Sequence, residues 1–204
     1  MNYTYSMDGR LPSILTQGNM ISYTTSKTEQ DLLQILALQK NNLQASLSSE
    51  QIASQGFVTV SHSLADLRNM NNIEPHIIAR IDGQVVAYAL AMTTLSKADI
   101  PVLAPMFDLF DSIIFRDRKI SEQPYIVVGQ VCVAAGYRGR GILDNCYMAY
   151  KKHFEGKYDF AITEISKRNP RSLNAHRRIG FEVVHEYQAP DGETWCIVLW
   201  NWKN

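Results

Sequence analysis

Apolar and polar positions along the chain follow two different spacings, and each spacing predicts one kind of element. Apolar residues three and four positions apart, as in the leucine-rich stripe that follows Thr28, predict helices. Runs of β-branched and aromatic residues bounded by turn residues predict strands. The helices expected from these patterns are 28–41, 49–54, 63–70, 142–154 and 170–179. The strands expected are 21–25, 76–81, 85–92, 125–133, 158–165, 181–187 and 194–200.

Turn residues and one long connection complete the outline. Asp82-Gly83 and Asp191-Gly192 are tight-turn dipeptides, so each is expected to join two strands into a hairpin. The connection 95–122 is long for a joint between strands and carries apolar residues at helical spacing. We expect it to pack on the sheet, although it would also suit a substrate wall or a homodimer contact. The polar residues 1–19 read as an extended lead-in or a loose tail.

Strands and helices interleave along the whole chain, which is typical of α/β and α+β folds. The chain has 204 residues, enough for one sizeable hydrophobic core and short for two. The sequence therefore predicts a single domain over residues 1–204 with a mixed sheet flanked by helices.

Composition narrows the classes of function. Hydrophobic residues make up 46% and charged residues 20%, as in ordinary globular proteins. The 20 basic and 20 acidic residues balance, so there is no general positive field and we expect no nucleic acid and no membrane as partner. Cys132, Cys146 and Cys196 are widely spaced, which argues against disulfides or a zinc site and favours a cytoplasmic location. Neither a signal peptide nor a membrane-spanning run is visible.

The basic, glycine-rich turn at residues 136–141 carries the most specific chemistry. It follows a buried strand and precedes a helix, so the unpaired N–H groups and the positive dipole end of that helix would border it. Its glycines let an anion approach the backbone, and Arg138 and Arg140 add charge. After Gly141 the residues of a P-loop are missing, and the glycine that a dinucleotide fingerprint needs at position 144 is missing too. A pyrophosphate cradle and a plain strand-to-helix turn with solvated arginines both stay open.

A second segment, residues 163–181, follows the rules of helix capping. Asn169 is a good N-cap, Pro170 fits a first helical turn, and Gly180 suits a left-handed C-terminal cap with Phe181 behind it. A well-capped helix that leads into a strand explains most of this segment. It does not explain why the basic turn and this segment occur in this order and spacing.

Together the two segments resemble the GNAT superfamily of N-acetyltransferases. The family's phosphate motif, Q/R-x-x-G-x-G/A, is matched at Arg138 and Gly141. Its later motif, N-x-x-A/S-x-x-x-Y-x-x-x-G-F, is matched at Asn169, Ser172, Gly180 and Phe181. The resemblance covers residues 125–187 and agrees in element order before them. Two positions depart from the motifs, because Leu143 replaces a small residue and His176 replaces the tyrosine.

The resemblance implies a central mixed, mostly antiparallel twisted sheet flanked by helices. It implies an N-acetyltransferase that moves an acetyl group from acetyl-CoA to a primary amine of a small molecule or peptide, by direct attack in a ternary complex and without a metal. The implied acetyl-CoA contacts are Val131, Cys132, Val133, Arg138, Gly139, Arg140, Gly141, Ile142, Leu143, Asn169 and Ser172. The two departures keep an alternative open, a catalytically silent module that senses acyl-CoA.

Direct attack requires the amine to lose a proton and the thiolate to gain one. His176 shares a helix face with Ser172, four residues before it, and is a candidate general acid. Glu164 is the candidate base, because the strand 125–133 has no carboxylate and Gln130 could only orient a water. Deprotonation relayed by water is a third option. Cys132, in a buried strand, is expected to be a small apolar residue rather than a nucleophile.

Overall fold

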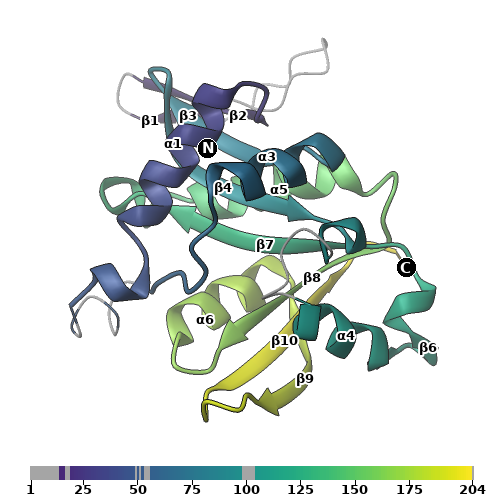
Figure 1. The fold of residues 1–204 in the computed structure, drawn as a ribbon. Helices are drawn as coiled ribbons and strands as arrows, with labels where there is room; N and C mark the ends of the chain where they lie inside the picture. The colour runs from purple at the N-terminus through teal and green to yellow at the C-terminus, as the bar shows by residue number, and fades with distance from the viewer. Residues whose placement is uncertain are drawn as a thin grey trace.

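Eight strands form one twisted sheet in the order β1-β2-β3-β4-β7-β8-β10-β9 (Figure 1). The structure is a computed structural model that describes residues 14–16, 19–48, 50, 52, 56–97 and 104–203. The strands are β1 (Ile14–Thr16), β2 (Asn19–Thr25), β3 (Ile77–Ile81), β4 (Gln84–Met92), β7 (Tyr125–Val133), β8 (Phe160–Ser166), β9 (Glu182–Gln188) and β10 (Thr194–Asn201). Within this sheet only β7 and β8 pair in parallel, which confirms the expected mixed, mostly antiparallel sheet.

Helices cover both faces of the sheet, with α1 and α3 in front of it and α5 behind it in Figure 1. The helices are α1 (Glu29–Lys40), α3 (Leu64–Ile73), α4 (Ala104–Ser112), α5 (Ile142–Phe154) and α6 (Pro170–Ile179). Buried side chains of α1, α3 and α4 share one apolar cluster, and those of α5 and α6 share the other. The sheet therefore separates two cores, which is how a sheet with two apolar faces is buried.

Most predicted elements are confirmed, several with the same bounds. The strand 125–133 and the helices 142–154 and 170–179 begin and end where the sequence predicts. The strand predicted at 158–165 begins later, at Phe160, because the N–H groups of Lys157 and Tyr158 bond to the carbonyl oxygen of Phe154 and close the end of α5. Most of the predicted helix 49–54 and of the lead-in 1–19 lies outside the described residues.

The described part of the connection 95–122, residues 95–97 and 104–122, packs on the sheet. Met106, Phe107 and Phe110 of α4 are buried in the same cluster as α1 and α3, which favours core packing over the other two uses considered for this stripe. Ile114 departs from the predicted helical stripe, because it lies in β5 (Ile114–Phe115), which pairs with β6 (Arg118–Lys119), and is 67% exposed.

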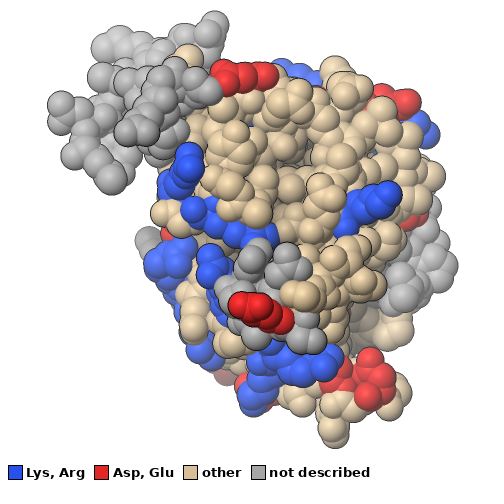
Figure 2. Space-filling view, turned by 90° about the vertical axis from the view of Figure 1, so that its left-hand side faces the viewer, with Lys and Arg blue, Asp and Glu red and all other residues tan. Residues whose placement is uncertain are grey.

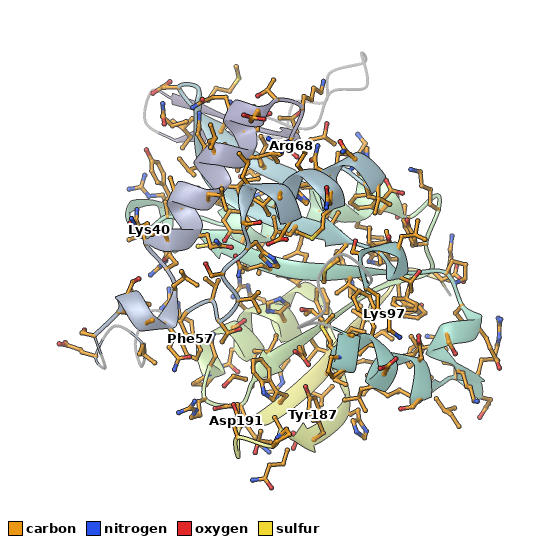
Figure 3. All side chains as sticks on the ribbon, viewed as in Figure 1. Lys40, Phe57, Arg68, Lys97, Tyr187 and Asp191 are labelled. Carbon is orange, nitrogen blue, oxygen red and sulfur yellow. The ribbon has the colours of Figure 1, made fainter. Side chains whose placement is uncertain are left out.

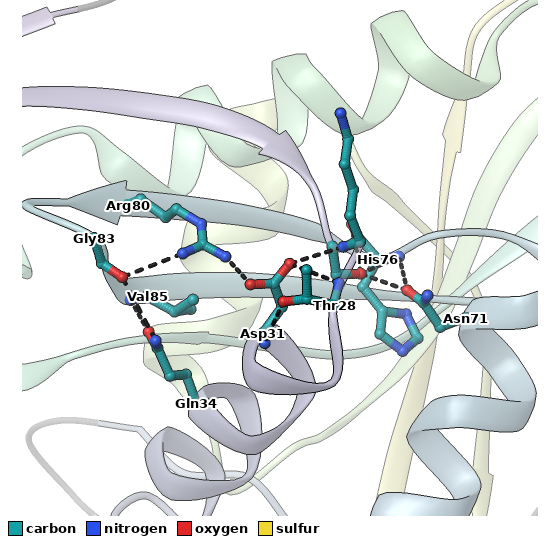
Figure 4. Close-up of polar contacts among 10 residues, drawn as sticks. Thr28, Asp31, Gln34, Asn71, His76, Arg80, Gly83 and Val85 are labelled. Atoms are coloured by element: carbon teal, nitrogen blue, oxygen red, sulfur yellow. Dashed lines mark hydrogen bonds and ion pairs between the residues drawn. The ribbon is translucent and has the colours of Figure 1, made fainter.

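A buried carboxylate ties the start of α1 to the β3–β4 hairpin (Figure 4). Asp31 accepts hydrogen bonds from the backbone N–H groups of Lys27 and Thr28 at 2.8 and 3.1 Å, and it forms an ion pair with Arg80. The Arg80 guanidinium also donates to the carbonyl oxygen of Gly83 at 3.2 Å. The buried charge is thus paired and hydrogen-bonded, as burial of a carboxylate requires.

His76, beside this region in Figure 4, is fully buried and neutral. Its Nδ1 accepts from the Ala91 N–H at 3.1 Å, so its Nε2 carries the proton and donates to the Leu67 carbonyl oxygen at 3.2 Å. Burial lowers the pKa of His76 from 6.5 to about 4. The unfolded chain therefore binds this proton more readily than the folded protein does.

This difference predicts acid sensitivity. A lowered histidine pKa stabilises the fold above the unfolded pKa of 6.5, and the stabilisation is lost as the pH falls toward about 4. We expect His76 alone to reduce the free energy of unfolding by about 2 kcal/mol between pH 7 and pH 5. Urea unfolding at both pH values measures it. The variant His76→Asn should be less stable at pH 7 but lose less on acidification, and equal losses in both proteins would contradict the prediction.

The strands β7 and β8 separate after a short parallel pairing. They pair only from Tyr125 to Val127 on β7, and the last link is the Thr163 hydroxyl, which donates to the Val128 carbonyl oxygen at 2.8 Å. A register shift against β4 places one extra residue in β7, so Val127 and Cys132 face the same cluster although they are five positions apart. The second half of β7 thus keeps an open edge toward β8, and the site lies there.

Candidate active site

The N-terminus of α5 has no side-chain cap. Side chains of Thr28, Ser63 and Asn169 cap α1, α3 and α6 by accepting a backbone N–H. The N-cap of α5 is Gly141, which has a φ of 73° and makes no side-chain hydrogen bond. The first N–H groups of α5, at the positive end of its dipole, are therefore left for an anion.

A cavity of about 750 Å³ borders this helix start. Its walls come from the 137–144 turn, α6, the second half of β7 and residues 56–58. Ten of the eleven predicted acetyl-CoA contacts line it: Val131, Cys132, Val133, Arg138, Gly139, Gly141, Ile142, Leu143, Asn169 and Ser172. Arg140 does not line it; the guanidinium carbon of this residue lies over the Tyr137 ring, 5.6 Å from its centre.

Positive charge predominates around this cavity. Arg138, Arg171 and Arg178 line it, against one acidic residue, Asp144. Asp144 is already paired with Arg178 through two hydrogen bonds of 3.0 and 2.9 Å. Figure 2 looks at the side of the molecule on which the β7–α5 turn lies, and lysine and arginine side chains gather on the left half of this face. The cavity therefore suits a ligand with several negative charges.

Arg138 shapes the turn from inside. Its Nε donates to the carbonyl oxygen of Val133 at 3.0 Å, and its guanidinium also donates to the Asn42 side chain at the end of α1. These two bonds hold the turn against β7 and α1. The arginine of the first motif thus positions the backbone around the cavity, in addition to supplying charge.

A smaller pocket of about 80 Å³ lies beside the cavity. It is lined by residues 57–60, by the facing parts of β7 and β8, and by Trp195 of β10. Six residues line both spaces: Phe57, Val58, Val131, Asn169, Ser172 and His176. The cavity and the pocket therefore meet where β7 and β8 separate, and a ligand in one could react with a ligand in the other.

Strand alternation determines which backbone groups of β7 face this junction. The N–H of Ala134 bonds to the carbonyl oxygen of Val86 on β4 at 2.8 Å. In an antiparallel pair every second residue directs its N–H and C=O to the same neighbour, so Cys132 also points to β4. Val131 and Val133 consequently direct their backbone groups to the open edge. Val131, which lines both spaces, presents its N–H there.

Asn169 joins the start of α6 to residues 57–60, which line the pocket. Its Oδ1 accepts from the Ser172 N–H at 3.2 Å, and its Nδ2 donates to the Phe57 carbonyl oxygen at 3.1 Å. Gln130 acts similarly from β7, because its Nε2 donates to the Val60 carbonyl oxygen at 2.8 Å while its Oε1 accepts from the Tyr88 hydroxyl at 2.5 Å. Both side chains thus hold residues 57–60 in place.

His176 lines both spaces and is 2% exposed. Its Nδ1 lies 2.8 Å from the Ser172 carbonyl oxygen, which can only accept, so Nδ1 carries the proton. Its Nε2 then accepts from the Tyr147 hydroxyl at 2.6 Å. Burial lowers the pKa of His176 to about 4, so the ring is neutral at pH 7 with both nitrogens engaged.

Glu164 lines the smaller pocket from β8. Burial raises the pKa of its carboxyl group, and a hydrogen bond from the Tyr187 hydroxyl opposes that rise. This bond is 2.6 Å long and ends on Oε2. In the described part of the chain, Oε1 has no hydrogen-bond donor within reach. Glu164 is half-buried, so a carboxylate with one oxygen free of donors lies at the edge of this pocket and is a candidate general base.

Cys132 lines the cavity but is protonated. Burial raises the pKa of its thiol to about 12, although Arg138 opposes this rise. Only a thiolate is a good nucleophile, so this cysteine behaves as the small apolar residue expected from the sequence.

The structure adds two features that the sequence analysis missed. Tyr187 reaches Glu164 from two strands away, and residues 57–60 cover the junction. No local spacing connects either to the motifs. The strand order places Tyr187 near Glu164, and side-chain contacts from Asn169 and Gln130 place residues 57–60. Among the described residues no group of three or more histidine, cysteine or acidic side chains is placed to hold a metal ion. No helix within that same part is long and apolar enough to cross a bilayer.

Sequence comparison identifies one family. The model of the acetyltransferase (GNAT) family matches residues 43–181, which contain both motifs and, apart from Asn42, every residue that lines the larger cavity. No curated protein sequence is significantly similar to this chain.

Several solved structures share the fold at low sequence identity. The ribosomal-protein-S18-alanine N-acetyltransferase from Escherichia coli is 12% identical over 91% of this chain and 96% of its own, with a TM-score of 0.60. A GNAT-family acetyltransferase from Streptococcus agalactiae is 13% identical over 92% and 98%, with a TM-score of 0.61. A chain of the NatC complex bound to Gag peptide and CoA is 16% identical over 89% and 98%, with a TM-score of 0.60.

Proposed function

Because this chain belongs to the acetyltransferase (GNAT) family, we propose that it transfers an acetyl group from acetyl-CoA to a primary amine of a small molecule or peptide. One observation carries the proposal. The uncapped start of α5 borders a cavity that meets, between β7 and β8, a pocket lined by the half-buried carboxylate of Glu164. An anion site, a reaction junction and a base thus lie in the order that acyl transfer to an amine requires.

The residues of the larger cavity fit a coenzyme A ester. The N–H groups at the start of α5 would hold its diphosphate, and the ideal Cβ position on Gly139 has no atom within 4 Å, so the turn leaves room for an anion. The arginines of the cavity would compensate its charge. The open edge of β7 would pair with the amide groups of its pantetheine arm. When bound, the ester supplies an activated acyl group.

The residues at the junction then act on the reacting atoms. The Val131 N–H, at the open edge of β7, donates a hydrogen bond to the carbonyl oxygen as that oxygen gains charge. Glu164 accepts the proton of the amine, either directly or through one water. The raised pKa of its carboxyl group makes it a better proton acceptor than an exposed glutamate. Attack is direct, since the Cys132 thiol is protonated. As the C–N bond forms, the C–S bond would break and the coenzyme would leave as a thiolate, protonated by water or by the candidate acid His176.

The general-acid role of His176 stays a prediction, and its contacts set out a sharp test. A neutral ring with both nitrogens engaged suits a positioning role, in which His176 holds α6 against Tyr147 of α5. For His176→Phe we expect a loss of about 1–3 kcal/mol in the free energy of unfolding, because the buried Tyr147 hydroxyl loses its acceptor. We expect the fold-decrease in turnover to be no larger than the fold-decrease in affinity for CoA.

Chemical unfolding measures the free energy of unfolding, calorimetry measures the affinity for CoA, and steady-state rates measure turnover. All three can be measured on one protein preparation. Tyr147→Phe removes the same hydrogen bond from its other end and is the matched control. If His176 is instead the general acid, turnover will fall far more than CoA affinity in His176→Phe and will survive in Tyr147→Phe.

The activity itself is tested by thiol release from acetyl-CoA over a panel of primary amines and peptides. We expect release with at least one acceptor and a matching mass increase of that acceptor. Binding of acetyl-CoA without turnover across a broad panel would support the acyl-CoA sensor instead. Absence of CoA binding by folded protein would refute both.

A further inference from the structure

Tyr187 reaches the smaller pocket from β9, an edge strand. Tyr187 is paired with Trp195 of β10, and Glu164 of β8 is paired with Ile197 two residues further along β10. The Tyr187 side chain therefore crosses β10 diagonally, and its hydroxyl donates to Oε2 of Glu164 at 2.6 Å. Figure 3 shows Tyr187 beside β10 at the lower end of the sheet.

The hydrogen bond from Tyr187 fixes Oε2 of the Glu164 carboxylate and leaves Oε1 available to a ligand. Burial raises the pKa of the Tyr187 phenol, so the hydroxyl stays protonated and acts as a donor. With Oε2 fixed, the carboxylate plane can no longer rotate freely about its last torsion. Oε1, without a donor in the described residues, is then the oxygen that an amine in the pocket would meet.

We infer that Tyr187 is a positioning residue, which holds the Glu164 carboxylate ionised and oriented so that Oε1 takes the proton of the acceptor amine. The inference rests on the proposed role of Glu164 as the base. It assigns a function in the site to β9, a strand that carries neither motif. It also explains how a carboxylate that burial disfavours can be kept charged, because the donor opposes desolvation.

Few other titratable groups face this carboxylate. His185 of β9 is paired with Ile197, which lies between it and Glu164, so the exposed His185 is on the same face of the sheet one strand further out. His176 of α6 lines the same pocket and is neutral at pH 7, while the facing parts of β7 and of residues 57–60 contribute none. Asp191, in the β9–β10 turn, acts on Tyr187 and raises its pKa further. The buried carboxylate of Glu193 is paired with Arg168 and with the Ser166 hydroxyl. Tyr187 is therefore the donor expected to set the ionisation of Glu164.

The test is the pH profile of kcat/KM for Tyr187→Phe, measured with the best acceptor found for the wild-type enzyme. Loss of the donor should move the acid limb upward by about one pH unit. On the high-pH plateau the rate should recover to within about threefold of wild type, since the substitution removes only a hydroxyl group. A merely structural role would lower the rate by the same factor at every pH. A ¹³C NMR titration of the Glu164 carboxyl group in both proteins gives the same shift independently of activity.

Tyr158→Phe is the matched control. The Tyr158 hydroxyl donates to Oε1 of Glu74 at 2.9 Å, an equivalent tyrosine–glutamate pair that lines neither the cavity nor the smaller pocket. Its acid limb should stay where it is in the wild type. An unmoved limb and an unmoved carboxyl titration in Tyr187→Phe would overturn the inference, while Glu164→Gln would still be inactive. If Glu164→Gln is itself fully active, Glu164 is not the base, and the proposed function of this residue is refuted rather than the role of Tyr187 alone.

Discussion

Gly141→Glu is expected to raise the Kd for CoA at least about a hundred-fold, which corresponds to a loss of about 2.7 kcal/mol. Gly141 is the N-cap of α5, and the first backbone N–H groups of this helix are the proposed diphosphate site. A glutamate there places a negative charge and a side chain in the space an anion needs. Its φ of 73° also disfavours any other residue by about 1 kcal/mol. Calorimetry with CoA and with acetyl-CoA measures the effect.

Two control variants separate charge from backbone strain. Gly141→Ala has room, since the ideal Cβ would lie 3.8 Å from the Asn145 amide nitrogen, so it reports the strain alone. Gly156→Glu adds the same charge just beyond the C-terminal end of α5, where the ideal Cβ has no atom within 4 Å. Both should bind CoA more tightly than Gly141→Glu does. Wild-type affinity in a folded Gly141→Glu protein would remove the basis of the proposed function.

Glu164→Gln is expected to lower kcat/KM by about a hundred-fold or more, within the range that a general base contributes. The amide keeps the shape of the side chain and still accepts from the Tyr187 hydroxyl, but it cannot take a proton. The cavity proposed for CoA lies on the other side of the junction, so the Kd for CoA should change little. Steady-state rates as a function of acceptor, together with calorimetry, measure the two effects separately.

The pH profile makes this prediction stricter. A carboxyl group acts as a base only above its pKa, so wild-type kcat/KM should fall as the pH drops through the pKa of Glu164, which burial raises above 4.5. In Glu164→Gln this limb should disappear. Glu186→Gln is the control, because Glu186 is an exposed residue of β9 that forms an ion pair with Lys167. Equal turnover of wild type and Glu164→Gln would instead favour a water-relayed route without this carboxylate.

Local sequence determined most of the secondary structure and the turn that is proposed to hold an anion. Side-chain periodicity and caps act within one or two turns of chain, so α5 and α6 were predictable to the residue. Gly180 is a further example. It caps α6 with a φ of 120°, and it also approaches Trp200 so closely that a Cβ would lie 2.9 Å from the indole nitrogen. The cap was readable in the sequence, whereas the contact was not.

The chemistry of individual side chains depended on partners that no spacing encodes. The sequence marked His176 by its helix face, but Tyr147 and the Ser172 carbonyl decided that its ring is buried, neutral and engaged. It marked Glu164 by its strand, but burial and Tyr187 decided its ionisation. The sequence identified Arg138 as a positive charge near the turn. In the fold its guanidinium also donates a hydrogen bond to the Asn42 side chain and so holds the turn against the end of α1.

By itself, then, the sequence determined the elements and the turn that would hold an anion, because these depend on neighbours close along the chain. The mixed sheet was expected from the order of the elements and from the family resemblance. Only the tertiary structure decided where β7 and β8 separate, which groups face that opening, and how residues 57–60 and Tyr187 complete it. These features depend on desolvation and on contacts between residues far apart in the chain, and both arise only when the strands are assembled in their order.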